Sequence, residues 1–284
     1  MHTDNHSGYL NTLGMRLLES AMQNQGPIFT MKQIKPIAKN MGVSDTHLRF
    51  LISSLSHANK IEIIKQGTYV ITSPIFTEDI SPYAIAAALV NPMAIGYWSA
   101  CAYHGFTTQT PVMIQAATPK KVVTPEMRKK NVETSRPRGR AVWKAYGQEY
   151  EFVNVKQERF WGHEKIWVSS WHQVNITDQE RTALDMVVRS DLFGGISAAM
   201  DLLENALAQI SVNRLVQYAQ RYNDVRAIKR LGWTLEKLGV PDSELAELIE
   251  YHAKGYYKLD IGQSSDNAPK NDRWHVIENL HRGK

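Results

Sequence analysis

Cysteine, long apolar runs and secretory features are scarce or absent in this chain of 284 residues. Its single cysteine, Cys101, excludes an internal disulfide framework and a zinc site built from several cysteines, and it is typical of a reducing compartment. The longest apolar stretch, residues 83–90, is much shorter than the roughly 20 residues that cross a bilayer, and the polar beginning has no secretory signal. We therefore expect a cytoplasmic protein, without a membrane partner, that is stabilised by packing.

The motifs of common enzyme classes are also absent. The chain has no Gly-x-Gly-x-x-Gly, no phosphate-binding loop, no Gly-x-Ser-x-Gly, no His-Glu-x-x-His and no Glu-x-Lys or Asp-x-Lys triplet. Cys101 and His104 share a face of a predicted helix, but their apolar neighbours favour a packed cysteine and a hydrogen-bonded histidine. His163 with Glu164, and His172, offer two histidines without a third defined ligand and are expected to be ordinary surface residues. We expect no catalysis, no cofactor and no metal.

Positive charge is concentrated in one stretch of the sequence. The chain has a formal net charge of +5, whereas residues 119–144 alone carry nine lysines and arginines against two glutamates. Such a field suits a polyanion such as nucleic acid, although a solvated loop and sheet face is the alternative that this pattern leaves open. We predict a second, phosphate-contacting basic surface made of Lys120, Lys121, Arg128, Lys129, Lys130, Arg136, Arg138, Arg140 and Lys144.

Residues 38–44 have the composition of a helix-turn-helix corner. Gly42 allows a turn with positive φ, Val43 can fill the angle between two helices, and Ser44 can cap the helix that follows. In that helix, apolar residues recur with helical spacing and predict a buried stripe of Leu48, Leu51, Ile52 and Leu55. On its outer side we predict base or phosphate contacts by Ser44, Thr46, His47, Arg49 and Ser53.

Two further elements are predicted before this corner. Residues 8–25 predict a helix, and residues 28–30 a short strand. Residues 30–33 have capping-box spacing, but Pro36 would cost about 3 kcal/mol in a second helical turn. We therefore place the helix proper at residues 36–41, with Pro36 near its first position.

A β-hairpin is predicted directly behind the helix-turn-helix. Residues 61–64 and 69–71 predict strands, and the turn between them forms a wing whose tip offers Lys65, Gln66 and Thr68 to phosphates or the minor groove. The pattern over residues 38–71 resembles the winged helix-turn-helix of bacterial transcription regulators. That resemblance implies a recognition helix lying in the major groove of DNA.

The same pattern is compatible with roles that do not involve DNA. Winged helices also serve as protein-interaction modules, and helix-turn-helix patterns arise by chance in helical proteins. Residues 1–75 carry a net charge of only +3, so we expect this domain alone to bind DNA weakly at physiological salt. Phe50, on the outer side of the second helix, could meet a thymine methyl group, but we favour its packing against a neighbouring domain.

The rest of the chain predicts strands followed by helices. We expect strands within residues 110–177 and helices within residues 178–254. The predicted fold class is α+β, with a winged helix-turn-helix domain at residues 1–75 and a mixed α/β domain with a helical C-terminal layer at residues 76–284. The helix expected after Thr177 turns an apolar face to the core, formed by Ala183, Leu184, Val187 and Val188.

Several segments carry a family resemblance. Residues 97–105 read Tyr-Trp-Ser-Ala-Cys-Ala-Tyr-His-Gly, residues 157–162 read Gln-Glu-Arg-Phe-Trp-Gly, and residues 176–185 read Ile-Thr-Asp-Gln-Glu-Arg-Thr-Ala-Leu-Asp. Together with the Gly194–Gly195 helix start and the region of Trp274, they resemble the AbiEi family over nearly the whole chain. Members of that family are the antitoxin and repressor half of bacterial abortive-infection (type IV) toxin-antitoxin pairs.

This resemblance implies both a function and partners. It implies an N-terminal domain that represses its own operon through upstream inverted repeats, and a C-terminal domain that neutralises a nucleotidyltransferase-like toxin without a stable complex. Arg181 stands where the family commonly has lysine, which keeps the charge and the helix. We therefore expect an autorepressor and antitoxin of antiviral defence, with double-stranded DNA and the toxin as partners. The alternatives are a winged-helix regulator without a toxin, a protein-only adaptor, and a nucleic-acid-processing enzyme with an unrecognised acidic cluster.

Overall fold

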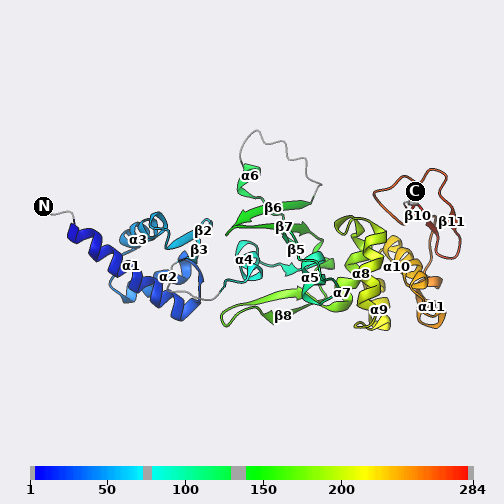
Figure 1. The fold of residues 1–284 in the computed structure, drawn as a ribbon, viewed down its shortest axis with the longest axis horizontal. Helices are drawn as coiled ribbons and strands as arrows, with labels where there is room; N and C mark the ends of the chain where they lie inside the picture. The colour runs from blue at the N-terminus through cyan, green and yellow to red at the C-terminus, as the bar shows by residue number, and fades with distance from the viewer. Residues whose placement is uncertain (1–3, 73–78, 129–138, 281–284) are drawn as a thin grey trace.

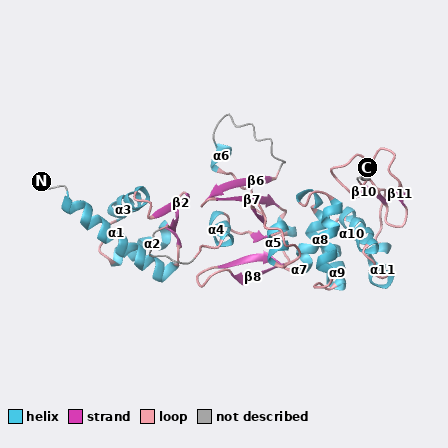
Figure 2. Cartoon of the chain, viewed as in Figure 1, coloured by secondary structure: helices cyan, strands magenta, loops and turns pink. Residues whose placement is uncertain are grey.

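The computed structural model describes residues 4–72, 79–128 and 139–280, with side chains from residue 12 onward (Figure 1). It confirms the predicted α+β class, because helices gather at both ends of an elongated molecule and a six-stranded sheet lies between them (Figure 2). None of the described helices is long and apolar enough to cross a membrane. Four members of the predicted basic surface lie outside the described residues, namely Lys129, Lys130, Arg136 and Arg138.

The N-terminal lobe, residues 4–72, packs three helices against a three-stranded antiparallel sheet with the strand order β1-β3-β2. Its core includes Leu17, Phe29 and Ile34, all shielded from solvent. The chain order of helix, strand, two helices and hairpin is the order that the sequence predicts. The elements are α1 (Asp4–Gln25), β1 (Ile28–Thr30), α2 (Met31–Asn40), α3 (Asp45–His57), β2 (Ile61–Lys65) and β3 (Thr68–Ile71).

The start of α2 differs from the prediction. The helix begins at Met31 rather than at Pro36, so that Pro36 lies in its interior. Thr30 and Gln33 form a complete capping box, in which the Thr30 N–H donates to Gln33 Oε1 at 2.8 Å and the Gln33 N–H donates to Thr30 Oγ1 at 3.3 Å. These cap bonds and the burial of Ile34 stabilise the helix, although Pro36 removes one backbone hydrogen bond.

The corner between α2 and α3 forms as predicted. Gly42 has a φ of 74°, in the left-handed region that favours glycine, and Val43 is buried in the core of the lobe. Ser44 caps α3, because its Oγ accepts a hydrogen bond from the His47 N–H at 3.3 Å. All four predicted stripe residues are buried, so the rotation of α3 about its axis is the predicted one: Leu48, Leu51, Ile52 and Leu55.

The middle lobe is built on a mixed six-stranded sheet with the order β6-β7-β5-β4-β9-β8, in which β5 runs parallel to β7 and β4 runs parallel to β9. The strands predicted within residues 110–177 are present. The sequence pattern missed β4 because that strand has only two residues. The elements are α4 (Pro82–Leu89), β4 (Ala94–Ile95), α5 (Tyr97–Tyr103), β5 (Ile114–Thr118), α6 (Pro125–Arg128), β6 (Arg140–Ala145), β7 (Gln148–Asn154), β8 (His163–Trp167) and β9 (Gln173–Thr177).

The C-terminal lobe is the predicted helical layer, followed by a small sheet with the order β10-β12-β11. The region of Trp274 anchors this sheet on the helices, because the Trp274 side chain is fully buried against Gly232. The elements are α7 (Gln179–Val188), α8 (Ile196–Leu207), α9 (Val212–Tyr222), α10 (Val225–Lys237), α11 (Asp242–Glu250), β10 (Tyr257–Lys258), β11 (Lys270–Asn271) and β12 (Val276–Ile277).

The N-terminal and middle lobes share an apolar core. Ile28, Ile64 and Val70 belong to the same buried cluster as residues of α4 and of the six-stranded sheet. The loop between β8 and β9 also reaches the N-terminal lobe, where Trp171 packs so close to Gly26 that an added Cβ would lie 2.7 Å from the tryptophan Cβ. The two lobes are therefore joined by packing as well as by the chain between them.

Candidate functional site

The outer side of α3 is open to solvent. Ser44, Thr46, Arg49 and Ser53 are exposed and His47 is half-buried, so the five predicted contacts of this helix lie together on its accessible side. Phe50 lies among them with 57% of its surface exposed. Our expectation that Phe50 packs against a neighbouring domain is therefore wrong. Phe50 therefore belongs to the accessible surface of α3.

Three lysines of α2 accompany this face, and the sequence analysis did not single them out. Lys32, Lys35 and Lys39 recur with helical spacing on the outer side of α2. Lys35 Nζ forms an ion pair with Asp45 Oδ2 at 2.7 Å, and this hydrogen bond holds the pKa of Asp45 below its usual range. The helical spacing of these three lysines, on the side of α2 away from the buried Ile34, is a sequence signal that could have identified them.

The tip of the hairpin β2–β3 does not stand free. Lys65 Nζ donates to the carbonyl oxygen of Leu89 at 2.9 Å and to that of Ala88 at 3.4 Å, both at the end of α4. Thr68 has only 4% of its surface exposed, whereas Gln66 is exposed. The predicted wing-tip contact by Thr68 is therefore wrong, because this side chain is buried.

The hairpin tip and the basic stretch instead form one feature, which we call the basic cleft. It has a volume of about 370 Å³ and lies between the tip of hairpin β2–β3, the end of α4 and the segment that leads into α6. Its charged lining residues are Lys65, Lys120, Lys121 and Arg128. Two sites that the sequence analysis predicted separately thus meet at the boundary between the lobes.

Two other members of the predicted basic surface are engaged elsewhere. Arg140 pairs with Glu151, with 2.7 Å between Nη2 and Oε1, and the Glu151 side chain is almost completely buried. Lys144 pairs with Glu149 at 2.7 Å. The prediction that Arg140 contacts phosphate is therefore wrong, because its guanidinium neutralises a buried carboxylate. Lys144, in contrast, stays accessible.

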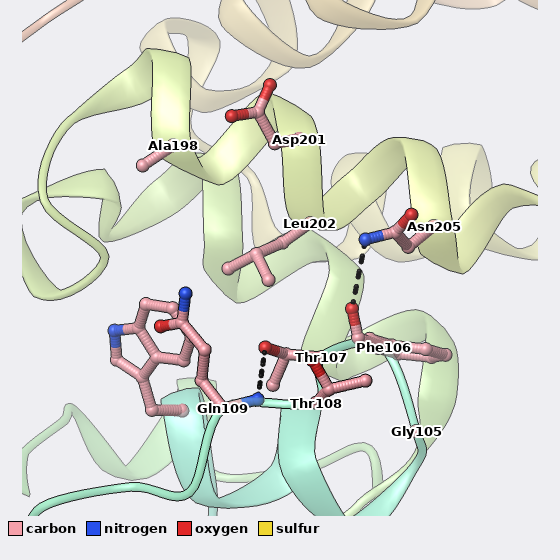
Figure 3. A pocket seen from close by; sticks show the side chains of 10 residues that line it. Gly105, Phe106, Thr107, Thr108, Gln109, Ala198, Asp201, Leu202 and Asn205 are labelled. Carbon is pink, nitrogen blue, oxygen red and sulfur yellow. Dashed lines mark hydrogen bonds between the residues drawn. The ribbon is translucent and has the colours of Figure 1, made fainter.

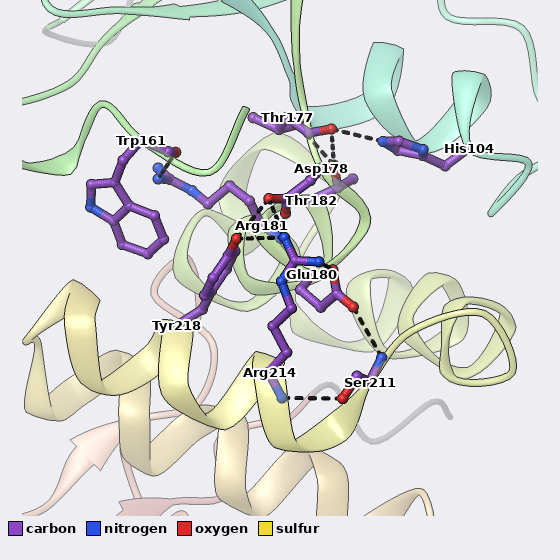
Figure 4. A network of polar contacts seen from close by, with 10 residues as sticks. All are labelled: His104, Trp161, Thr177, Asp178, Glu180, Arg181, Thr182, Ser211, Arg214 and Tyr218. Carbon is purple, nitrogen blue, oxygen red and sulfur yellow. Dashed lines mark hydrogen bonds and ion pairs between the residues drawn. The ribbon is translucent and has the colours of Figure 1, made fainter. Parts of the chain in front are cut away.

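Arg181 on α7 brings together two of the segments that carry the family resemblance. Its side chain is 3% exposed, and its Nε donates to Asp185 Oδ1 at 3.0 Å. Its Nη1 donates to the carbonyl oxygens of Arg159 at 2.9 Å and Trp161 at 2.8 Å, so that the segment 157–162 wraps the guanidinium (Figure 4). This arginine fixes the position of α7 through a buried, hydrogen-bonded charge.

The third segment of the resemblance reaches the same region through a histidine. His104 Nε2 lies 2.7 Å from the carbonyl oxygen of Thr177, directly before α7 (Figure 4). Cys101 is fully buried, and burial raises the pKa of its thiol. The prediction of a packed cysteine and a hydrogen-bonded histidine is therefore confirmed.

A polar cleft of about 500 Å³ adjoins this network and is lined by residues of α7, α9 and β8. Arg214 pairs in it with Asp178 at 3.1 Å and with Glu180 at 3.4 Å, and the Tyr218 hydroxyl donates to Asp178 at 2.7 Å (Figure 4). Because two carboxylates meet the Arg214 cation, these contacts tie α9 to α7.

The remaining histidine candidates are partly enclosed by the fold. His163 and His172 are half-buried rather than ordinary surface residues, and burial lowers the pKa of both. Among residues 4–72, 79–128 and 139–280, no group of three or more histidine, cysteine, aspartate or glutamate side chains is placed to hold a metal ion.

Another cleft, of about 540 Å³, lies between α8 and the loop after α5 (Figure 3). The indole of Trp98 and the side chains of Gln109 and Leu202 line it, and Asn205 Nδ2 donates to the Phe106 carbonyl oxygen at 3.3 Å. This bond joins α8 to the loop.

Comparisons with known proteins show what the chain resembles in three dimensions. No protein-family model matches the chain, and neither does any curated protein. Its structure is similar to the crystal structure of the RV2827C protein from Mycobacterium tuberculosis, with a TM-score of 0.65, 14% sequence identity, and coverage of 94% of this chain and 91% of that chain. At this identity, the similarity shows that the two chains share a fold over nearly their whole lengths, and it shows the fold alone.

Proposed function

We propose that the protein is a DNA-binding transcriptional autorepressor without catalysis of its own, and that its N-terminal lobe is a winged helix. The observation that carries this proposal is the outer side of α3, which is polar, basic and aromatic while its other side is held by the core. A helix fixed in this way can enter the major groove, since its long axis and its exposed side chains are already oriented.

The lysines of α2 supply the contacts that position such a helix. In helix-turn-helix proteins the first helix crosses the DNA backbone while the second reads bases. Lys32 and Lys39 are exposed on α2, and Lys35 lies beside the start of α3. These cations raise the phosphate attraction of a lobe whose net charge is small, and phosphate contacts set the register of the protein on the duplex.

The same proposal includes an antitoxin activity in the remainder of the chain. Its support is the resemblance of residues 97–105, 157–162 and 176–185 to the AbiEi family, together with the contacts that bring these segments to one place around Arg181. The partner would be a nucleotidyltransferase-like toxin, opposed without a stable complex. Coexpression with the product of the neighbouring gene tests this part, since growth arrest by that product and its relief by this protein are both required.

A regulator without a toxin is the main alternative, and it has the same DNA chemistry. A neighbouring gene whose product causes no growth arrest would favour it over the antitoxin. An adaptor that binds only proteins would leave DNA from the region upstream of its own gene unretarded. A nucleic-acid enzyme would cleave or modify that DNA when divalent metal ions are added.

Arg49 gives the sharpest test of the DNA contact. Replacing Arg49 with alanine removes an exposed cation from the middle of the outer face of α3, and we expect affinity for upstream DNA to fall by about 5- to 150-fold, equivalent to about 1–3 kcal/mol. Gel-shift titration at two salt concentrations measures the loss. Reporter expression from the upstream region should rise in parallel.

The matched control is Lys254→Ala. Lys254 is exposed just after α11, and Figure 1 places α11 at the opposite end of the molecule from α3. Both changes remove one positive charge, so a general effect of net charge would be equal in the two variants. Equal affinities for Arg49→Ala and the unchanged protein would contradict a DNA-reading role for α3.

A further inference from the structure

The basic cleft concentrates positive charge without acidic side chains among its described lining residues. Lys65, Lys120, Lys121 and Arg128 come from two lobes and meet around a space of about 370 Å³. One water molecule occupies about 30 Å³ of liquid, so the cleft admits a phosphate group together with part of its hydration shell. Trp143, aliphatic side chains and the polar residues Gln66 and Asn91 form the rest of the wall.

Two of the cations are already held by hydrogen bonds to backbone carbonyl groups. Lys65 Nζ donates to the Leu89 carbonyl oxygen at 2.9 Å, and Lys120 Nζ donates to the Asn91 carbonyl oxygen. Burial, and next the neighbouring Lys120, lower the pKa of Lys65. Two lysines held near each other repel, and the carbonyl groups at the end of α4 offset only part of that repulsion. An anion between them would be stabilised by both charges without any loss of side-chain freedom on binding.

The other two cations of the cleft come from one segment of the chain. Lys121 and Arg128 are exposed at its rim, in the segment that leads into and through α6. Arginine suits bidentate contact with a phosphate, and lysine supplies a point charge beside it. The cleft therefore offers two cations that backbone carbonyl groups hold and two further cations from the segment that leads into and through α6.

The position of the cleft is compatible with a DNA strand that also contacts α3. In Figure 1, α3, the hairpin β2–β3 and α6 follow one another along the same upper edge of the molecule. The hairpin, whose tip forms one wall of the cleft, directly follows α3 in the chain. A duplex that contacts α3 and runs along this edge would reach the cleft.

We propose that the basic cleft binds a backbone phosphate of the same DNA duplex that α3 reads, so that the hairpin and the middle lobe act as one phosphate clamp. This inference rests on the proposed function. It changes the role of the hairpin, because its tip contacts DNA jointly with Lys120, Lys121 and Arg128 instead of entering the minor groove alone. Such a clamp adds affinity that does not depend on base sequence.

The test compares two double variants of the full chain. In Lys121→Ala/Arg128→Ala both rim cations are lost, and we expect the slope of log affinity against log salt to fall by up to about two, since each phosphate contact contributes roughly 0.9. The control, Lys165→Ala/Lys254→Ala, removes two exposed cations from β8 and from the segment after α11, and Figure 1 shows β8 along the opposite edge from α6. Its slope should match that of the unchanged protein. Circular dichroism verifies that both variants fold.

Hydroxyl-radical footprinting locates the contact. The unchanged protein should protect one backbone segment beside the groove occupied by α3, and the rim variant should lose that protection while the α3 footprint stays. An unchanged slope and footprint in the rim variant, or equal slopes in the rim variant and the control, would overturn the clamp and leave the proposed function standing. Failure of the unchanged protein to retard upstream DNA would instead overturn the proposed function, and the clamp with it.

Discussion

Replacing Arg181 with methionine is expected to lower the free energy of unfolding by about 3–5 kcal/mol, because it leaves Asp185 buried without its partner. Asp185 is 2% exposed, and its Oδ2 has no hydrogen-bond partner among the described residues. The change also removes the donors to the carbonyl oxygens of Arg159 and Trp161. Denaturant unfolding followed by circular dichroism measures the loss.

The pH dependence of this loss identifies its cause. Burial raises the pKa of Asp185 even with Arg181 present, and removal of Arg181 raises it further. Because the unfolded carboxyl has a pKa near 3.9, the folded variant binds a proton more tightly than the unfolded one, and the variant loses stability as pH rises. The deficit relative to the unchanged protein should therefore be larger at pH 8 than at pH 5. Equal deficits would rule out the unpaired carboxylate as the cause.

Arg214→Met is the matched control for this experiment. Arg214 pairs with two carboxylates, Asp178 and Glu180, and about half of its own side chain is exposed. When Arg214 is lost, Asp178 still accepts a hydrogen bond from the Tyr218 hydroxyl and Glu180 still accepts one from the Ser211 N–H, so this variant should lose less stability than Arg181→Met. A loss as large as that of Arg181→Met would mean that burial does not distinguish the two arginines.

Replacing Gly232 with alanine should destabilise the C-terminal lobe by about 3 kcal/mol. A Cβ at this position would lie 1.9 Å from one ring carbon of Trp274 and 2.5 Å from two others. The ring cannot move aside easily, because it is fully buried and its Nε1 donates to Glu236 Oε2 at 2.9 Å. This overpacking outweighs the gain of up to about 1 kcal/mol that alanine usually brings to a helix.

A second substitution tests whether the contact with Trp274 is responsible. Trp274→Leu in the Gly232→Ala background makes room for the new methyl group, so the double variant should lose less stability than the sum of the two single losses. Glu204→Ala, at an exposed position of α8, is the control and should change stability by less than about 0.5 kcal/mol. Strictly additive losses in the double variant would contradict a steric cause. Thermal unfolding of the four variants is the measurement.

The sequence predicted α3 well because all its determinants are local. The cap at Ser44, the turn at Gly42 and the spacing of Leu48, Leu51 and Ile52 act within a few residues, so the exposed side of the helix follows from them. The predicted start of α2 is wrong for a different reason. The expected cost of Pro36 argues against a helix over residues 30–36, whereas the structure contains both the capping box at residues 30–33 and the proline.

Positions that depend on distant segments could not be predicted in this way. The expected apolar face of α7 is largely present, but the helix is also buried at Glu180, Arg181 and Asp185. Their charges are typical of solvent-facing positions, and only the fold brings the carbonyl group of Trp161 to Arg181. The same holds for the hairpin tip, because nothing in residues 61–71 indicates that Lys65 reaches the end of α4.

The core shared by the N-terminal and middle lobes determines how the N-terminal lobe can be studied. A fragment of residues 1–75 would expose Ile28, Ile64 and Val70 to solvent, although all three are buried in the whole chain. Because of this exposed apolar patch, we expect the fragment to aggregate and to fold poorly. The N-terminal lobe is thus not an independent folding unit, and a fusion that includes it should also include the sheet against which it packs.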